Sequence, residues 1–305
     1  MMAFLEVEHL QKAYDSVSAV NDFSFSLDRG EIYALVGPDG AGKTTIMRML
    51  CNLVRPDSGG ATIDGHDFFA QFDQVKPMLG YMPQIFSLYP DLSVEENLVF
   101  HAGIYDVVGD KYRRKRDEMY GFSRLQPFAN RRASDLSGGM KQKLALSCAL
   151  MHEPGLLILD EPTTGVDPLS RRQFWDILLQ LKKQGVAIMV ATPYMDEVAR
   201  VDRACFMFGG RKLAEGTPAE LVQTFDGCVF FVDFIPDAKT VTFLNSIEGL
   251  AASRFGAGLH LYLATEDTPE RYRAELTSAG IDPSAARPVA PDLEDCFVQL
   301  MERPV

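Results

Sequence analysis

The residues from Gly37 to Thr45 have the types and spacing that bind a phosphate group. Gly37, Gly42, Lys43 and Thr44 satisfy the pattern G-x-x-x-x-G-K-[ST]. Such glycines let backbone N–H groups approach phosphate oxygens, and the hydroxyl after the lysine can bind Mg²⁺. A helix that follows the loop adds its positive N-terminal end to the same anion. We therefore predict a phosphate site formed by Gly37, Pro38, Asp39, Gly40, Ala41, Gly42, Lys43, Thr44 and Thr45.

Two predicted elements flank this loop. The nearly continuous apolar run 32–36 suits a buried strand, and residues 46–53 suit a helix. A strand before the motif and a helix after it are the context that phosphate binding requires. The alternative, a glycine-rich turn that binds nothing, is disfavoured by that context.

A second anion site is predicted in residues 136–142. Ser137 fits the N-cap position of the helix that follows, where the N–H groups of Gly138 and Gly139 have no helical partner. A chain rarely needs two such sites for one phosphate, so the second site requires an explanation.

Two adjacent carboxylates follow a short buried strand predicted at 156–159. In a protein with a phosphate loop, Asp160 suits a Mg²⁺ ligand and Glu161 suits a base for water. Taken alone, an Asp-Glu pair is usually a solvated turn, so this assignment depends on the phosphate loop.

The remaining pattern indicates a mixed α/β chain. Alternating apolar residues at 5–7 and 23–27 predict a small antiparallel sheet that leans on a parallel core, with Tyr14 in a loop between its first strands. A capping box at 93–96 starts a helical region that runs to about 151, and Asp167 as N-cap with Pro168 at the first helical position predicts a further helix over 169–184. Beyond about Asp226 the pattern favours a small α+β domain.

Composition limits the class of protein. The chain has 305 residues, of which 47% are hydrophobic and 24% charged, and a formal net charge of −12. That charge disfavours broad binding to nucleic acid. No apolar run is long enough to cross a bilayer, and Glu6 and Glu8 lie where a signal peptide needs basic residues, so a cytoplasmic location is expected. The five scattered cysteines are expected to be buried, reduced thiols.

In their order, these motifs resemble those of the ATP-binding subunit of ABC transporters, over about residues 3 to 222. The matching segments are 37–45 (Walker A), Gln84 (the Q-loop glutamine), 136–142 (the LSGGQ signature, with Met140 in the fifth position), 156–161 (Walker B) and 165–167 (the D-loop). The segments 37–40, 81–84 and 293–297 are similar to those of subunits of bacterial ABC-2 type exporters, including multidrug exporters.

The resemblance implies a P-loop NTPase core with an antiparallel β subdomain and a helical signature subdomain, about 87–152. These would form a cassette over residues 1–222, and residues 226–305 would form the C-terminal accessory domain.

The resemblance also implies ATP and Mg²⁺ as cofactors and assigns roles to the site residues. Lys43 would neutralise the β- and γ-phosphates, Thr44 and Asp160 would hold Mg²⁺ together with Gln84, and Glu161 would orient or activate water. Gln84 would also sense the γ-phosphate, and Tyr14 falls where the family places its adenine-stacking aromatic residue.

Two cassettes of this family close head to tail, which explains the second anion site. Ser137, Gly138 and Gly139 would face the γ-phosphate held by a second cassette, in a homodimer or a heterodimer. Membrane permease subunits would be the other partners, and the chain would lie peripherally on the inner face of the cell membrane.

One departure from the family concerns its switch histidine. The context Thr-His after the strand that follows the D-loop reads Thr192-Pro193 here. Proline has neither an imidazole nor an N–H, so it cannot donate to a γ-phosphate. The leading hypothesis is an attenuated ATPase that is paired with a cassette that keeps its histidine. The alternatives are a non-hydrolytic regulatory subunit and a soluble ABC ATPase that acts on nucleic acid.

Overall fold

The computed structural model describes residues 3–302, and the chain divides into two units, one ending at Thr217 and the other beginning at Pro218. The strands of the first unit are β1 (Leu5–Tyr14), β2 (Val17–Leu27), β3 (Ile32–Val36), β4 (Ser58–Ile63), β5 (His66–Asp67), β6 (Leu79–Met82), β7 (Leu156–Asp160), β8 (Ala187–Thr192), β9 (Arg203–Phe208) and β10 (Arg211–Gly216). Its α-helices are α1 (Lys43–Met49), α2 (Phe72–Val75), α3 (Val94–Ile104), α4 (Gly109–Ser123), α5 (Gly138–Ala149), α6 (Pro168–Lys183) and α7 (Met195–Val198).

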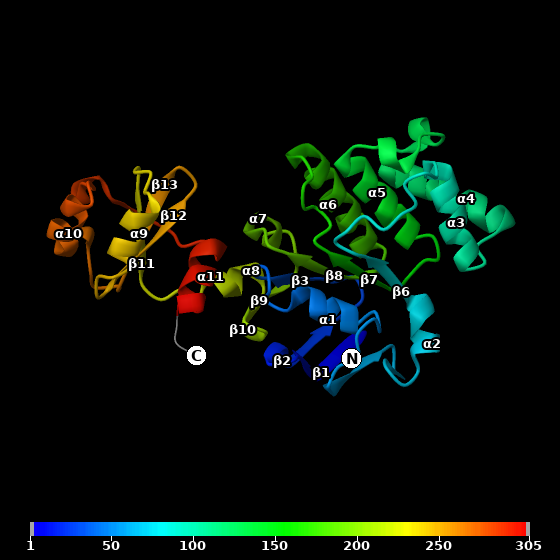
Figure 1. Ribbon diagram of the computed structural model, residues 1–305, viewed down its shortest axis with the longest axis horizontal. Helices are drawn as coiled ribbons and strands as arrows, with labels where there is room; N and C mark the ends of the chain where they lie inside the picture. Colours follow the sequence, from blue (N-terminus) through cyan, green and yellow to red (C-terminus); the bar gives the residue numbers. More distant parts are fainter. Residues whose placement is uncertain (1–2, 303–305) are drawn as a thin grey trace. The chain divides into compact units, whose positions relative to one another are not determined.

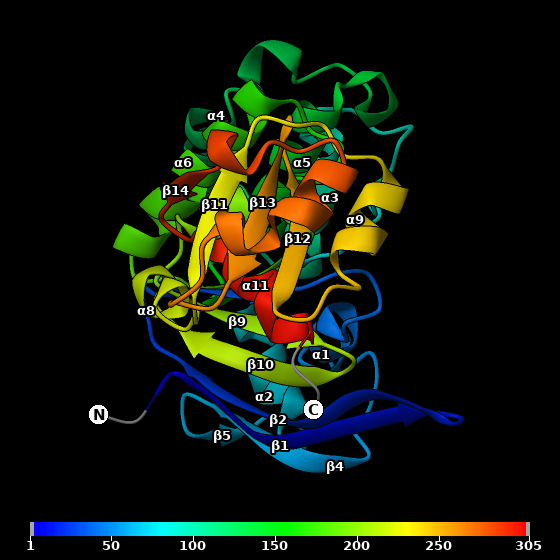
Figure 2. The same cartoon turned by 90° about the vertical axis from the view of Figure 1, so that its left-hand side faces the viewer.

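A six-stranded sheet in the order β10-β9-β3-β8-β7-β6 forms the centre of the first unit. All its neighbouring strands pair in parallel except β9 and β10. Helices α3 to α6 lie on one side of this sheet, and α1 with the strands β1 and β2 lies on the other (Figures 1 and 2). Every residue of β3, β7 and β8 is therefore buried, which explains their continuous apolar sequences.

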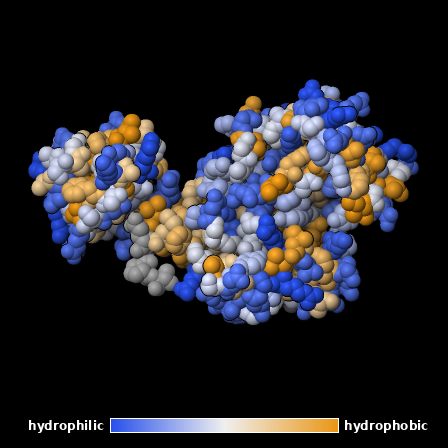
Figure 3. All heavy atoms as spheres, in the orientation of Figure 1, coloured by the Kyte–Doolittle hydropathy of each residue, from blue (hydrophilic) through white to orange (hydrophobic). Residues whose placement is uncertain are grey.

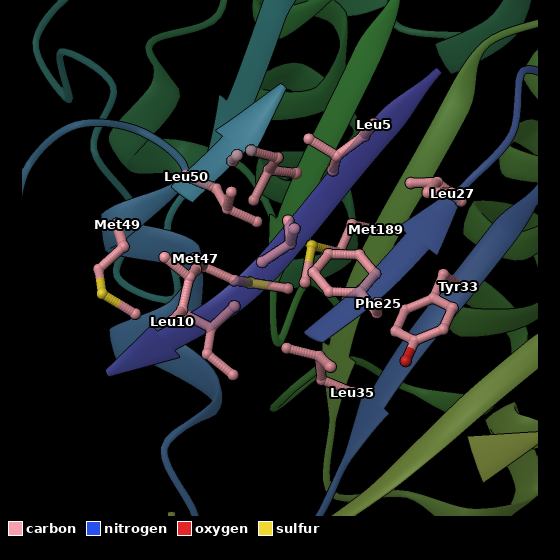
Figure 4. Close-up of a cluster of buried hydrophobic side chains, with 14 of the residues drawn as sticks. Leu5, Leu10, Phe25, Leu27, Tyr33, Leu35, Met47, Met49, Leu50 and Met189 are labelled. Atoms are coloured by element: carbon pink, nitrogen blue, oxygen red, sulfur yellow. The ribbon is translucent and has the colours of Figure 1, made fainter. Parts of the chain in front are cut away.

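A second sheet in the order β2-β1-β4-β5 is antiparallel, as the alternating sequence predicted. Figure 4 shows the buried side chains that fasten it to the six-stranded sheet and to α1: Leu5 and Leu10 from β1, Phe25 and Leu27 from β2, Tyr33 and Leu35 from β3, Met47, Met49 and Leu50 at α1, and Met189 from β8. Because each of these apolar side chains contributes about 1.5–3 kcal/mol when buried, the cluster fixes α1 and the loop before it.

Several local predictions are confirmed by the backbone. Ser93 and Glu96 form the expected capping box of α3, and Asp167 caps α6 with proline at its first position. Two expectations were wrong. Tyr14 is the last residue of β1 and not part of a loop, and α1 begins at Lys43, within the glycine motif itself.

The second unit is an α+β fold with a four-stranded antiparallel sheet in the order β12-β13-β11-β14. Its elements are α8 (Pro218–Val222), β11 (Cys228–Val232), α9 (Ala238–Leu244), β12 (Leu250–Phe255), β13 (Gly258–Leu263), α10 (Arg273–Ser278), β14 (Arg287–Val289) and α11 (Leu293–Glu302). The structure groups α8 with this unit, whereas the sequence placed residues up to 222 in the first domain. The Cys296 thiol of α11 donates to the Val222 carbonyl, 3.4 Å away.

A buried polar cluster anchors α11 to its sheet. Asp295 accepts hydrogen bonds from the Tyr262 hydroxyl (3.0 Å) and from the Asp292 N–H (2.9 Å), and its carboxylate lies 2.6 Å from His260 Nδ1. These partners satisfy a carboxylate that has no solvent exposure.

Across residues 3–302, every helix is too short or too polar to span a bilayer.

The five cysteines are free thiols, as expected. Cys148, Cys205 and Cys296 are buried, but Cys51 and Cys228 are only partly so, which corrects the expectation that all five are buried.

The thiols are therefore expected to react at different rates with iodoacetamide at pH 8. Burial raises the pKa of Cys205 to about 12 and also raises that of Cys148, so both hold little of the reactive thiolate. Cys228 should be labelled first, as measured by mass spectrometry of peptides over time. Labelling of Cys148 or Cys205 as fast as that of Cys228 would contradict this burial pattern.

Candidate active site

A cavity of about 440 Å³ lies at the carboxyl end of β3. Ten of the residues predicted from the sequence line it, together with Ala19: Tyr14, Asp39, Gly40, Ala41, Gly42, Lys43, Thr44, Thr45, Gln84 and Glu161. Its size falls within the range of small-molecule sites, about 300–1,000 Å³. Residues from four separate stretches of the chain thus meet in one place.

The loop 37–42 brings backbone close to backbone at two glycines. A Cβ on Gly37 would lie 2.3 Å from the Met207 carbonyl oxygen. A Cβ on Gly42 would lie 2.3 Å from the Ala19 carbonyl oxygen, and its φ of +104° is one that other residues rarely adopt. Only glycine fits at either position, so the path of the loop fixes these two motif residues.

Lys43 is buried at the first position of α1, with 4% of its side chain exposed. Its ammonium group donates to the carbonyls of Gly37 (2.7 Å) and Pro38 (3.0 Å) and lies 3.7 Å from Glu161 Oε1. The cation is therefore held at the helix N-terminus, beside the N–H groups that favour an anion.

The Thr44 hydroxyl lies 3.1 Å from Asp160 Oδ1 and donates to it. Burial raises the pKa of the Asp160 carboxyl, and the charge of Glu161 also raises it, against the lowering effect of the Thr44 hydrogen bond. A cation at this point would stabilise the ionised carboxylate. A hydroxyl and a carboxylate oxygen are ligands that Mg²⁺ accepts, so the pair fits that ion.

Residues 3–302 contain no cluster of three or more His, Cys, Asp or Glu side chains suited to a metal. Mg²⁺ characteristically uses one or two protein carboxylates and completes its shell with water and substrate phosphates. Thr44 and Asp160 provide one hydroxyl and one carboxylate, which fits this ligand preference. The assignment of Gln84 to the metal stays a prediction.

Glu161 is 6% exposed and has a φ of +49°, in the left-handed region that costs a residue with a side chain about 1–3 kcal/mol. Its N–H donates to the Ala191 carbonyl, 3.0 Å away. Its Oε2 accepts from Gln84 Nε2 (2.9 Å) and from the Thr164 hydroxyl (3.2 Å). The carboxylate is thus held at a defined point of the cavity wall.

Tyr14 is the last residue of β1, is 44% exposed and lines the cavity. The Lys12 ammonium lies 5.6 Å from the ring centre and 2.6 Å from Asp57 Oδ1. The Ala13 N–H donates to the other Asp57 oxygen, at 2.7 Å. Asp57 therefore holds the strand end that carries the aromatic ring.

Ser137, Gly138 and Gly139 do not line this cavity. Ser137 is exposed and caps α5 by accepting from the Met140 N–H at 3.4 Å. Gly139 packs against α6, where an added Cβ would lie 2.5 Å from the Ser170 side chain. The residues predicted to form a second anion site thus lie at the exposed N-terminus of α5, apart from the cavity, and their binding of an anion stays a prediction.

Pro193 follows the last residue of β8, next to the chain segment that carries Glu161. No histidine lines the cavity, although all five histidines fall within the described part of the chain. His101 and His152 line a different cavity, and His260 belongs to the second unit.

Sequence reasoning missed the polar residues behind this wall. Thr164 donates to Glu161, while Thr163 and Thr192 both donate to the buried Glu197, each at 2.6 Å. Their only sequence signal is position, since Thr163 and Thr164 follow the Asp-Glu pair after one proline, and Thr192 ends a strand at the same sheet edge.

Comparison with protein families gives a match to the model described as ABC transporter, over residues 20–164. The chain is 36% identical to the Nod factor export ATP-binding protein I of Rhizobium etli over 304 residues, which cover 99% of this chain and 94% of that protein. It is 37% identical to the probable multidrug ABC transporter ATP-binding protein YbhF of Escherichia coli, also over 304 residues.

That second match covers 98% of this chain but only 52% of YbhF, so the chain spans about half the length of that relative. Among solved structures, an ATP-binding subunit of an ABC transporter superposes with a TM-score of 0.67 at 31% identity. The superposition covers 73% of this chain and 93% of that one.

Alanine substitutions in the loop should separate close contact from backbone strain. Gly42→Ala meets both the Ala19 carbonyl and an unfavourable φ, whereas Gly40→Ala has a φ of +80° and no atom within 4 Å of the added Cβ. Gly40→Ala should lower the free energy of unfolding by about 1 kcal/mol and Gly42→Ala by about 3 kcal/mol or more, as measured by urea unfolding. Equal losses would show that the close contact at Gly42 is wrong.

Proposed function

The chain belongs to the ABC transporter family, as an ATP-binding cassette, and from this premise we propose that it hydrolyses ATP to drive export through separate membrane subunits. The observation that carries the proposal is the meeting of the phosphate loop with two carboxylates, through the contacts of Thr44 with Asp160 and of Lys43 with Glu161. A phosphate cradle, a metal ligand pair and a base are the parts that phosphoryl transfer to water requires.

In this proposal the nucleotide lies along the cavity from Tyr14 to Glu161. The Tyr14 ring stacks on the adenine, and the N–H groups of the loop with Lys43 bind the β- and γ-phosphates. Mg²⁺, bound by Thr44 and Asp160, would neutralise charge that develops on the phosphate oxygens. Gln84 contributes a polar contact beside Glu161 and the γ-phosphate.

Glu161 accepts a proton from the water that attacks the γ-phosphorus, while the bond from that phosphorus to the β,γ-bridging oxygen breaks. The fixed position of its carboxylate supports this role, because an oriented base lowers the barrier by avoiding reorganisation. The Gln84 and Thr164 hydrogen bonds supply that orientation.

Pro193 stands where the family places a histidine that contacts the γ-phosphate. A lost hydrogen bond to a charged group is worth about 1.5–3 kcal/mol, roughly 10 to 150-fold in rate if it acts in the transition state. We propose that this site binds ATP and hydrolyses it slowly. The outward-facing Ser137 at the start of α5 then completes the site of a second cassette, which in a heterodimer keeps the histidine.

A second cavity, of about 450 Å³ and called the groove below, is the proposed binding place of the membrane partner. It lies against β6, α3 and α5, and its lining is mainly apolar and aromatic, including Tyr81, Phe86 and Tyr105. Ile85 near this groove is 81% exposed and Ile104 at the end of α3 is 54% exposed. Figure 3 shows apolar residues gathered over α3.

We propose that a short apolar helix of a permease subunit binds in this groove and holds the chain at the inner face of the membrane. Pro83 and Phe86 line the groove, and Gln84 between them contacts Glu161. A movement of this segment would therefore reach the base directly. The second unit, which contains no part of either cavity, is proposed as an accessory domain.

The first test is phosphate release by the purified chain with Mg²⁺ and ATP. Glu161→Gln keeps the side-chain shape but removes the base, so the turnover number should fall by about 100-fold while nucleotide affinity is kept. An unchanged turnover number would favour the non-hydrolytic regulatory subunit. Binding of the chain to nucleic acid at physiological salt would favour a soluble ABC ATPase that acts on nucleic acid, although the net charge of −12 disfavours such binding.

The second test restores the histidine. Pro193→His should raise the turnover number by about 10-fold or more, because it returns a donor to the γ-phosphate. Pro193→Ala is the matched control, since it removes the proline ring without adding an imidazole, and it should give no comparable gain. If the parent chain hydrolysed ATP as fast as a cassette that has the histidine, and Pro193→His did not raise the turnover number, the proposed attenuation would be wrong.

A further inference from the structure

We infer that Glu197 is a positioning residue, which fixes the loop after β8 against the turn that carries Glu161. The inference rests on the proposed function, because it concerns the base of that same site. Glu197 lies on α7 and is 1% exposed, yet its residue type carries a charge that is costly to bury without partners. The partners that the structure provides show what this charge does.

Each carboxylate oxygen of Glu197 accepts a hydroxyl hydrogen bond of 2.6 Å. Thr163 donates to Oε1 and Thr192 donates to Oε2. Thr163 belongs to the turn after β7, and Thr192 is the last residue of β8. One buried carboxylate therefore joins the ends of two neighbouring strands of the sheet, through strong charge-assisted bonds.

Arg171 of α6 supplies the neighbouring positive charge. Its Nε lies 3.8 Å from Glu197 Oε1, beyond hydrogen-bond reach but within ion-pair range, and this nitrogen has no hydrogen-bond partner among residues 3–302. The Nη1 of the same guanidinium group donates to Asp196 Oδ2 at 3.4 Å. Its guanidinium group also lies 4.2 Å from the centre of the Tyr194 ring. The Tyr194 N–H in turn donates to the Thr192 hydroxyl, at 3.1 Å. Pro193 is thus enclosed between two residues that this cluster holds.

The turn held by Thr163 is the turn that orients the base. The Glu161 carbonyl accepts from the Thr164 N–H at 3.2 Å, and the Thr163 carbonyl accepts from the Val166 N–H at 3.2 Å. The Glu161 N–H reaches back to β8 at Ala191. Because Glu161 has a left-handed φ, neighbouring contacts must hold it there, and the Thr163–Glu197 bond is one that comes from another element.

The consequence is that Glu197 acts on the chemical step through Glu161 and not on nucleotide binding. The phosphate loop contacts neither Glu197 nor its threonine partners in the hydrogen bonds that the structure records. A loosened turn would misplace the base relative to water, and a displacement near 1 Å can cost about 100-fold in rate. The Michaelis constant for ATP would stay close to that of the parent.

The test uses the full chain and the variants Glu197→Gln, Thr163→Val and Thr163→Ser. Glu197→Gln removes the charge at constant shape, and Thr163→Val removes the hydroxyl at nearly constant volume. Both should lower the turnover number by about tenfold or more, with little change in the Michaelis constant. Thr163→Ser restores the donor and should recover most of the turnover lost in Thr163→Val. The double variant should lose little more than either single variant, because both break the same link.

Val198→Ala is the matched control for simple destabilisation, since Val198 is fully buried on the same short helix and its apolar side chain cannot form a hydrogen bond with Thr163, Thr192 or Glu197. Its melting temperature should fall while its turnover number stays within about twofold of the parent. If Val198→Ala lost turnover as severely as Glu197→Gln at equal melting temperature, Glu197 would be only a structural residue and the inference would fail.

Hydrogen–deuterium exchange of the nucleotide-free chain gives a readout that needs no activity. In Glu197→Gln and in Thr163→Val, peptides that cover 158–167 and 188–198 should both exchange about tenfold faster, while the phosphate loop is unchanged. Unchanged exchange in either peptide would overturn the inference. A parent without ATP turnover would count against the proposed function, and the exchange result would still decide the role of Glu197.

Discussion

The parallel pairing of β3, β8, β7 and β6 is the constraint on which the candidate site depends. In a parallel sheet all carboxyl ends lie at one edge, and ligands bind there. The register places Val36 opposite Thr192 and Asp160 opposite Ala191. The loops that follow these strands therefore meet, although Val36 and Thr192 lie more than a hundred positions apart in the chain.

Other elements of the first unit hold the residues at this sheet edge in position. The buried cluster between the two sheets and α1 holds the helix that follows the phosphate loop, and the antiparallel sheet places Tyr14 in the lining of the cavity. Around the two buried glutamates, hydrogen bonds between polar side chains hold the residues in place. Glu161 is held by Gln84 and Thr164, and Glu197 is held by Thr163 and Thr192.

Local features of the sequence predicted much of this fold. The apolar run 32–36 matches β3, the capping box at Ser93 starts α3, and the Asp-Pro pair at 167–168 starts α6. The glycine motif identified the loop because its close backbone contacts admit no side chain. These predictions succeed because each depends on a few adjacent residues.

The sequence could not show what depends on strand pairing. Nothing local indicates that Glu197 reaches Thr163, or that Gln84 reaches Glu161, since each contact joins two separate strand ends. Tyr14 was expected in a loop because β1 and β2 extend further than their alternating pattern, through irregular pairing near Leu10 and Lys12. Strand β14 was missed because it has only three residues, one of them proline.

Calorimetric titration of ATP, with and without Mg²⁺, tests the central claim that the phosphate loop and Asp160 form one nucleotide site. The parent chain should bind ATP at one site per chain, and Mg²⁺ should strengthen binding by about tenfold or more, through the Thr44 and Asp160 oxygens. Asp160→Asn should still bind ATP but lose that gain. An equal effect of Mg²⁺ on both proteins, or no binding by the parent, would contradict the account.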